Sequence, residues 1–238
     1  MTIRAAETSP IIYARVAGLL YLIIIVSGIF SEVYVRSSLI VTGDAAATAT
    51  KILASEWLFR IGFASDAIML LSDVAIAVLF YVLLKPVNHT LALMAAAFRL
   101  TQAAILGLNL LNYYAALLLL NGTGYANAFE ADQLHALMML FLDMHSHGYD
   151  LGLLFFGLSS LILGYLVAKS DYFPGILGYG LMAAALVYLT GSLTLFLFPD
   201  YLSFITPIYI VPLVAEVSFC LWLLVKGVKV LGKTKPLT

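Results

Sequence analysis

Charged residues are scarce in this chain. Only 11% of its 238 residues are Asp, Glu, Lys or Arg, whereas roughly a quarter of an ordinary soluble domain is charged. Hydrophobic residues make up 63%, and the mean hydropathy is +1.04. A globule of this size has too little interior for so many apolar side chains, so its surface would be largely hydrocarbon. The composition therefore excludes a water-soluble domain and indicates a protein whose solvent is the lipid bilayer.

A basic excess and a second cysteine are also lacking. Twelve Lys and Arg stand against thirteen Asp and Glu, so nothing is available to neutralise a phosphate backbone, and we expect no nucleic-acid partner. The single cysteine, Cys220, has no partner for an internal disulfide. Phosphate-binding glycine loops, the G-x-S-x-G nucleophile elbow and the H-E-x-x-H zinc motif are absent. We therefore expect no cofactor, and no motif identifies an enzyme.

Six apolar stretches are long enough to cross a bilayer, since a hydrocarbon core about 30 Å thick needs about 20 helical residues. We predict an all-α polytopic membrane protein, a six-transmembrane-helix bundle that forms one domain over residues 1–238. Asp44 is expected to cap a short external amphipathic helix between the first two spans. The predicted spans cover about residues 10–31, 57–84, 89–120, 131–168, 174–198 and 201–225.

The distribution of Lys and Arg predicts the orientation. Basic residues are enriched in cytoplasmic loops, so the side with more of them is expected to face the cytoplasm. Both termini then lie in the cytoplasm, and the protein lies in the inner membrane of a bacterium, in contact with membrane lipid. One side carries Arg4, Arg15, Lys85, Lys169, Lys226, Lys229, Lys233 and Lys235, and the other carries Arg36, Lys51 and Arg60.

Three ionisable residues are predicted to meet inside the membrane. Asp73 and Arg99 lie at nearly equal distances from the turn between the second and third spans, so antiparallel packing places them at the same depth. Glu216 on the sixth span lies close to that depth, and Pro212 is expected to open the helix one turn before it. Because a lone charge in lipid is costly, we expect a buried ion pair of Arg99 with Asp73, Glu216 or both. The alternative is that Asp73 or Glu216 is a proton or cation site.

A second polar layer is predicted nearer the outside. Asp66 is seven residues before Asp73, hence on the same helical face, and it is expected to face Asn109. On the fourth span, Asp143, His147 and Asp150 are expected to share a face, with His145 pointing to the opposite side. The pair Gly148 and Gly152 would let another helix approach closely. The predicted ligand-binding residues are Asp66, Asn109, Asn112, Asp143, His147 and Asp150.

The outer layer is not predicted to hold a metal. Zinc needs three or four converging ligands, and the fourth span offers only His147 with Asp143 or Asp150 on one face. A hydrated hydrogen-bonded cluster, or a site for a polar ligand or lipid headgroup, remains open.

Four segments resemble a bacterial integral-membrane family catalogued as domain of unknown function 4386. The resemblance covers the chain from about residue 15 to residue 227 and implies a polytopic membrane protein with no catalytic residue to transfer. The segments are residues 14–21 (ARVAGLLY), 43–49 (GDAAATA), 105–112 (ILGLNLLN) and 148–150 (GYD).

Three functions follow as hypotheses. The first is a membrane protein that binds or passes a small molecule, a proton or a cation through the polar layers between the second, third, fourth and sixth spans. The second is a metal-dependent intramembrane hydrolase that acts on lipid at the outer face, with Asp66, His147 and Asp150 as ligands or as general acid and base. The third is a structural or assembly protein. Nothing in the sequence indicates an oligomeric state.

Overall fold

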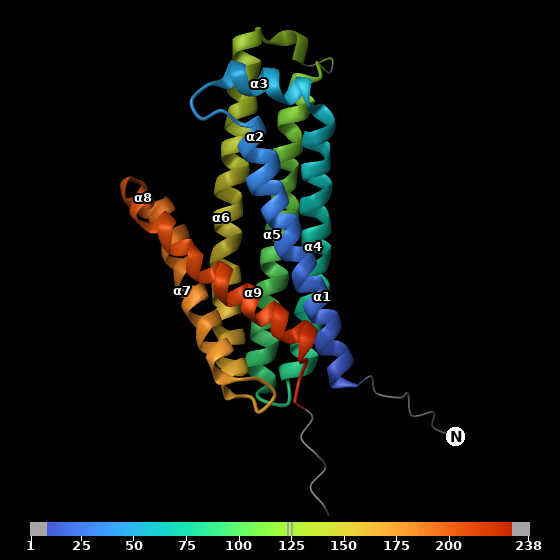
Figure 1. Ribbon diagram of the computed structural model, residues 1–238. Helices are drawn as coiled ribbons and strands as arrows, with labels where there is room; N and C mark the ends of the chain where they lie inside the picture. The colour runs from blue at the N-terminus through green and yellow to red at the C-terminus, as the bar shows by residue number, and fades with distance from the viewer. Residues whose placement is uncertain (1–8, 123, 125, 230–238) are drawn as a thin grey trace, which may run out of the picture.

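The fold is built from helices joined by short turns and loops. The computed structural model describes residues 9–122, 124 and 126–229 (Figure 1). Within these residues there is no strand, and six helices are long and apolar enough to cross a membrane. The predicted all-α polytopic bundle is therefore confirmed, and the protein is an integral membrane protein. The six candidate spans are Pro10–Leu39, Glu56–Leu84, His89–Leu120, Ala131–Lys169, Gly175–Leu197 and Pro199–Val225.

Shorter elements join and extend these spans. A π-helical stretch, Phe30–Arg36, continues the first helix, and 3-10 turns at Pro199–Tyr201 and Thr206–Tyr209 interrupt the last one. The α-helices are α1 (Pro10–Ile29), α2 (Ser37–Leu39), α3 (Ala45–Ala54), α4 (Glu56–Leu84), α5 (His89–Leu120), α6 (Ala131–Lys169), α7 (Gly175–Leu197), α8 (Leu202–Ile205) and α9 (Ile210–Val225).

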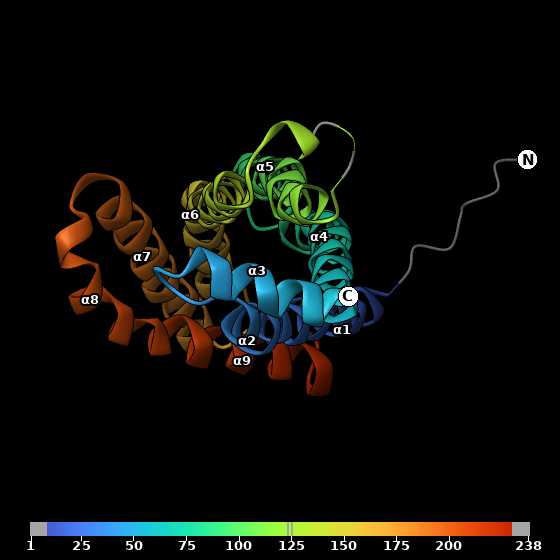
Figure 2. The ribbon, with the colours of Figure 1, turned by 90° about the horizontal axis from the view of Figure 1, so that it is seen from above.

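The six long helices form a closed ring in chain order. Each packs against the next, from α1 to α4, α5, α6, α7 and α9, and α9 returns to α1 (Figures 1 and 2). Closure occurs where α9 crosses the first half of α1. Gly18 has no side chain there, and Leu223 and Leu224 occupy the space that one would need. The thiol of Cys220 also donates to the carbonyl oxygen of Gly18 across 3.5 Å. The ring therefore leaves an interior that all six helices can line.

The two ends of the ring are filled by apolar side chains. Near the start of α1, which we call the terminal end, Tyr21, Phe80 and Phe219 form one aromatic core. Near α3, which we call the α3 end, Phe59 and Tyr113 stack with ring centroids 4.0 Å apart within a second core. The buried acids Asp66 and Asp73 lie between these two cores, since on α4 they fall between Phe59 and Phe80.

Helix α3 is the predicted short helix between the first two spans. It lies across one end of the bundle, over α1 and α2 (Figure 2). The side chain of Asp44 accepts a hydrogen bond from the backbone amide of Ala47 at 2.8 Å, as an N-cap residue does.

The expected end of the first span is wrong, and Pro212 does not have the expected effect on the last one. The first helix does not end near residue 31 but continues to Leu39. Its π-helical stretch places Arg36 inside the bundle, where Arg36 forms an ion pair with Asp66. The last helix begins again at Ile210, so Pro212 lies in the first turn of α9. A proline there removes no internal helical hydrogen bond, and the expected opening before Glu216 is not formed.

Candidate functional site

Asp73 and Arg99 form an ion pair in the middle of the ring. Atom Nη2 of Arg99 lies 2.5 Å from Oδ1 of Asp73, and Nε donates to the same oxygen at 2.9 Å. The guanidinium also lies 4.9 Å from the ring centroid of Phe156. Gln102, one turn further along α5, donates from Nε2 to Oδ2 of Asp73 at 3.1 Å. Asp73 therefore has both oxygens satisfied by α5, as a buried charge requires.

Asp66 holds a second arginine, which the sequence analysis had placed outside the membrane. Nη1 of Arg36 lies 2.7 Å from Oδ2 of Asp66, and both side chains are buried. Nε of Arg36 reaches Glu32 at 2.7 Å, one turn earlier on the same helix. Asp66 was expected to face Asn109, and both line one small cavity, while the ion pair of Asp66 is made with Arg36. The spacing of four residues between Glu32 and Arg36 is the signal of a continuing helix, and it could have revealed this pair.

Asn109 joins α5 to α6. Its Nδ2 donates to the backbone oxygen of His145 at 2.7 Å, and Nδ2 of Asn112 donates to Oδ1 of Asn109 at 3.0 Å. Gly148 makes room for this contact, since a side chain there would collide with the amide of Asn109. His145, expected to point away from the polar layer, is instead the buried histidine of α6. The Asn109 amide thus works mainly as a helix-to-helix hydrogen bond.

The three polar residues expected to share a face of α6 differ in burial and in partners, although Asp143 and Asp150 line the same cavity. Asp143 and His147 are exposed, and the ring of His147 lies against Phe196 with centroids 6.1 Å apart. Asp150 instead accepts a hydrogen bond at Oδ1 from Ser192 of α7, at 2.9 Å. Asp66, His147 and Asp150 therefore do not converge. No group of three His, Cys, Asp or Glu side chains with metal-binding geometry occurs in the part of the chain that the structure describes.

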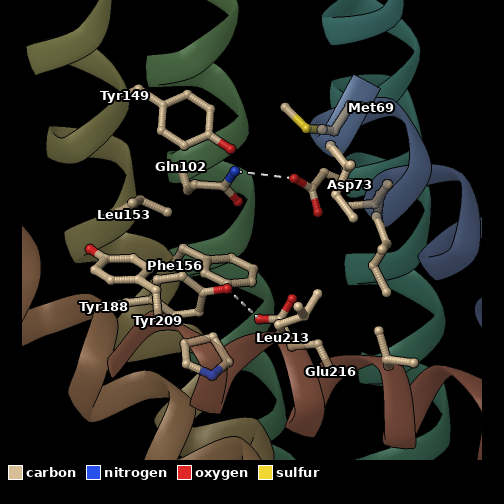
Figure 3. A pocket seen from close by; sticks show the side chains of 16 residues that line it. Met69, Asp73, Gln102, Tyr149, Leu153, Phe156, Tyr188, Tyr209, Leu213 and Glu216 are labelled. Carbon is tan, nitrogen blue, oxygen red and sulfur yellow. Dashed lines mark hydrogen bonds between the residues drawn. The ribbon is translucent and has the colours of Figure 1, made fainter. Parts of the chain in front are cut away.

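A cavity of about 290 Å³ lies in the middle of the ring, and we call it the central cavity (Figure 3). All six long helices contribute to its wall. Asp73, Gln102 and Tyr149 line it from α4, α5 and α6. Its apolar wall consists of Ile24, Ile25, Gly28, Ile29, Met69, Leu153, Phe156, Pro212, Leu213 and Val217.

Glu216 lines the central cavity from α9, away from the ion pair. Its Oε1 accepts a hydrogen bond from the hydroxyl of Tyr188 at 2.9 Å (Figure 3). It makes no ion pair with Arg99, so of the expected arrangements, in which Arg99 pairs with Asp73, Glu216 or both, the structure has the pair with Asp73. The Tyr188 ring contacts Phe156 edge to face, with centroids 5.2 Å apart. An acid without a cationic partner therefore lies on an aromatic wall.

A second cavity, of about 450 Å³, lies nearer the α3 end, and we call it the outer cavity. Glu32, Arg36, Asp143 and Asp150 line it together with His145. Tyr149 lines both cavities, so its ring lies between them.

Asp73 and Glu216 were expected at this depth, but the tyrosines of the central cavity were not. Tyr149, Tyr188 and Tyr209 carried no signal among the fourteen tyrosines in the chain. The signal that could have found Tyr188 is weak, because its partner Glu216 lies 28 residues away on another helix.

Comparison with known proteins gives a family and one distant relative. An uncharacterized protein of the archaeon Archaeoglobus fulgidus is 29% identical over 162 residues, which are 68% of this chain and 81% of the relative. No solved structure matches the chain. The family described as domain of unknown function (DUF4386) matches residues 16–227. The chain therefore belongs to the DUF4386 family, as the four sequence segments indicated.

Proposed function

We propose that the protein binds a small organic molecule in the central cavity of its helix ring. The observation that carries this proposal is the unsatisfied amide oxygen of Gln102. The residue is 3% exposed and lines the cavity, yet its Oε1 has no hydrogen-bond partner among the described residues. A buried acceptor without a partner costs free energy, and a ligand that donates a hydrogen bond would recover that cost.

The composition of the wall supports the same proposal. Small-molecule sites are mostly apolar cavities with a few convergent polar groups. Here branched aliphatic and aromatic side chains surround three side-chain functions: the Gln102 amide, the Tyr149 hydroxyl and the carboxylate of Glu216. The Tyr149 hydroxyl points into the cavity (Figure 3), and it donates to no residue that the structure describes. Polar groups from three different helices thus meet at one place.

Binding is favoured over passage through the ring. The aromatic core of Tyr21, Phe80 and Phe219 fills the terminal end below the cavity. Next to Arg99, a space toward that end has a volume of about 10 Å³, roughly the room of one water molecule. A ligand would therefore reach the cavity from the α3 end or from between α1 and α9, where Ile29 and Leu213 line the cavity and are also exposed.

The hydrolase alternative has less support. Its three expected residues, Asp66, His147 and Asp150, have different partners: Asp66 binds Arg36, and Asp150 accepts from Ser192. A general acid and base would need to reach one substrate atom, which this arrangement does not favour.

We also propose that the terminal end faces the cytoplasm. The end of α4, which Lys85 caps, and the end of α6 at Lys169 lie at that end with the start of α1 and the end of α9 (Figure 1). The enrichment of Lys and Arg there supports this orientation, in the inner membrane for a bacterial host. The α3 end and the outer cavity then face outward.

Thiol protection tests the binding proposal. Val217→Cys in a Cys220→Ala background introduces one thiol into the wall of the central cavity, and Leu221→Cys introduces one on the exposed face of the same helix. We expect 2-phenylethanol, a small neutral probe with a hydroxyl donor, to slow methyl methanethiosulfonate labelling of the first thiol in detergent-purified protein. Labelling of the second thiol is expected not to change.

Two glycines supply a matched control. Gly28→Leu fills the cavity from α1, whereas Gly107→Leu on α5 projects into open space outside the ring. Protection by 2-phenylethanol is expected to disappear in the first variant and to persist in the second. Protection that survives Gly28→Leu, or that is equal at positions 217 and 221, would disprove binding at this place.

A further inference from the structure

We infer that the ligand of the central cavity is a protonated organic amine with a small apolar body. This inference rests on the proposed function and adds the charge and the hydrogen-bonding character of the ligand. Four observations support it: the charges of the wall, the direction of the Gln102 amide, the charges of the outer cavity and the aromatic side chains around Glu216.

The wall of the central cavity carries two carboxyl groups and no free cation. Asp73 and Glu216 are its carboxylates, and none of the lining residues is Lys, Arg or His. Arg99 lies behind Asp73 and is already bound to it. Glu216 receives only the Tyr188 hydroxyl at Oε1, and no described residue donates to its Oε2. One carboxylate therefore faces the cavity uncompensated, and a cationic ligand would compensate it.

The hydrogen-bonding groups of the wall that lack a partner are acceptors. Oδ2 of Asp73 is an acceptor, so the Gln102 amide must present its NH₂ group to Asp73. That choice fixes the orientation of the amide and leaves Oε1, which can only accept, without a partner. Oε2 of Glu216 is likewise an acceptor. An ammonium group carries N–H donors for both, whereas a quaternary ammonium or an anion has none to offer.

The outer cavity has the same sign of charge. Glu32, Asp143 and Asp150 line it, with Arg36 as the one arginine. Arg36 is itself bound to Glu32 and to Asp66, a fourth carboxylate just behind the wall. Acidic side chains raise the local concentration of cations in a low-dielectric cleft, and Tyr149 lies between this cleft and the central cavity.

Aromatic rings and cavity size limit the shape of the ligand. Tyr188 contacts both Phe156 and Tyr209 edge to face, with centroids 5.2 and 6.0 Å away, and all three line the cavity beside Glu216. Ring faces attract ammonium groups. A volume of about 290 Å³ lies at the lower end of the range for small-molecule sites, about 300 to 1,000 Å³. A primary or secondary amine with one aromatic or short aliphatic group fits these limits.

The test is a charge series of probes of similar size. Protection of the Val217→Cys thiol is titrated at neutral pH with 2-phenylethylammonium, with neutral 2-phenylethanol and with the anion phenylacetate. We expect the ammonium probe to bind about tenfold or more tightly than the alcohol, and phenylacetate to give no protection. Glu216→Gln keeps the shape and the acceptor for Tyr188, and it is expected to bring the ammonium probe to the affinity of the alcohol. Glu56→Gln, an exposed carboxylate far from the cavity, is the control and is expected to keep the preference.

Each outcome decides between the two proposals. Equal protection by all three probes, or stronger protection by phenylacetate, would reject an amine ligand while leaving small-molecule binding in place. A preference for ammonium that Glu216→Gln does not change would reject Glu216 as its recognition group. Absence of protection by every probe would overturn the binding proposal together with this inference. The three probes are compared on protein with an intact Glu216. That comparison is therefore informative even if the Glu216→Gln variant does not fold.

Discussion

Asp66 and Asp73 lie two turns apart on the same face of α4, and each binds an arginine from a different neighbouring helix. Asp66 receives Arg36 from the end of the first span, and Asp73 receives Arg99 from α5. Two buried ion pairs therefore fasten α4 to the helices on either side of it, and they separate the two apolar cores of the ring. The four charges cancel, so the excess acid of the interior is Glu216.

Removing Arg36 should destabilise the ring strongly. Arg36→Met leaves Asp66 as a buried charge whose partner is gone, and such a loss costs about 3–5 kcal/mol. Arg60→Met is the matched control, because Arg60 pairs with Glu56 at an exposed position, where a pair contributes about 0–1 kcal/mol. The free energy of unfolding in mixed micelles measures both. The double variant Arg36→Met with Asp66→Leu should recover most of the loss, and equal losses in the two single variants would contradict a buried pair.

The close approach of α5 and α6 depends on Gly148. Gly148→Ala brings a methyl group into the amide of Asn109, and we expect the helices to separate at a cost of about 1–3 kcal/mol. Gly107→Ala on α5 meets no neighbouring atom and should leave the thermal midpoint unchanged or slightly raised. A Gly148→Ala protein as stable as the parent would show that Asn109 does not hold this contact.

The hydrogen bond between Asn109 and His145 should be measurable but modest. Asn109→Leu removes the donor to the His145 carbonyl oxygen, and interhelical hydrogen bonds in membranes contribute about 0.6 kcal/mol on average and about 1.7 at most. Asn112→Leu removes only the bond to the Asn109 side chain and should cost less. Unfolding free energies of the two variants, compared with the parent, test this order, and the reverse order would assign the main interhelical bond to Asn112.

Labelling from outside the cell tests the orientation. In a Cys220→Ala background, Asn127→Cys lies near the α3 end and Asp171→Cys lies in the turn between α6 and α7, and both positions are exposed. With the terminal end in the cytoplasm, a membrane-impermeant maleimide should label the first thiol in intact cells and the second only after lysis. Labelling of Asp171→Cys alone would reverse the proposed orientation, and with it the direction in which the outer cavity faces.

The contact between Asp73 and Arg99 could be predicted from the sequence because both residues belong to one hairpin. Their depth follows from counting residues from a single tight turn, and a charge in lipid needs a partner nearby. The pairing of Arg36 could not be predicted in the same way. The charge of Glu32 suggested that the first span ends there, and the π-helical stretch that contains Arg36 changes the direction in which its side chains point. His145 was misplaced for a related reason: the face that α6 turns inward depends on the packing of Gly148 against Asn109.

The sequence by itself determined that this protein lies in a membrane, that it crosses with six apolar helices, and which charged side chains must find partners there. These conclusions follow from the cost of placing backbone amides and charges in hydrocarbon, which depends on composition and spacing alone. Only the tertiary structure decided that the helices close into a ring, that Glu216 meets Tyr188 and not Arg99, and that a cavity remains beside them. Those features depend on the rotation and tilt of each helix, which side-chain packing between distant segments sets and no local pattern records.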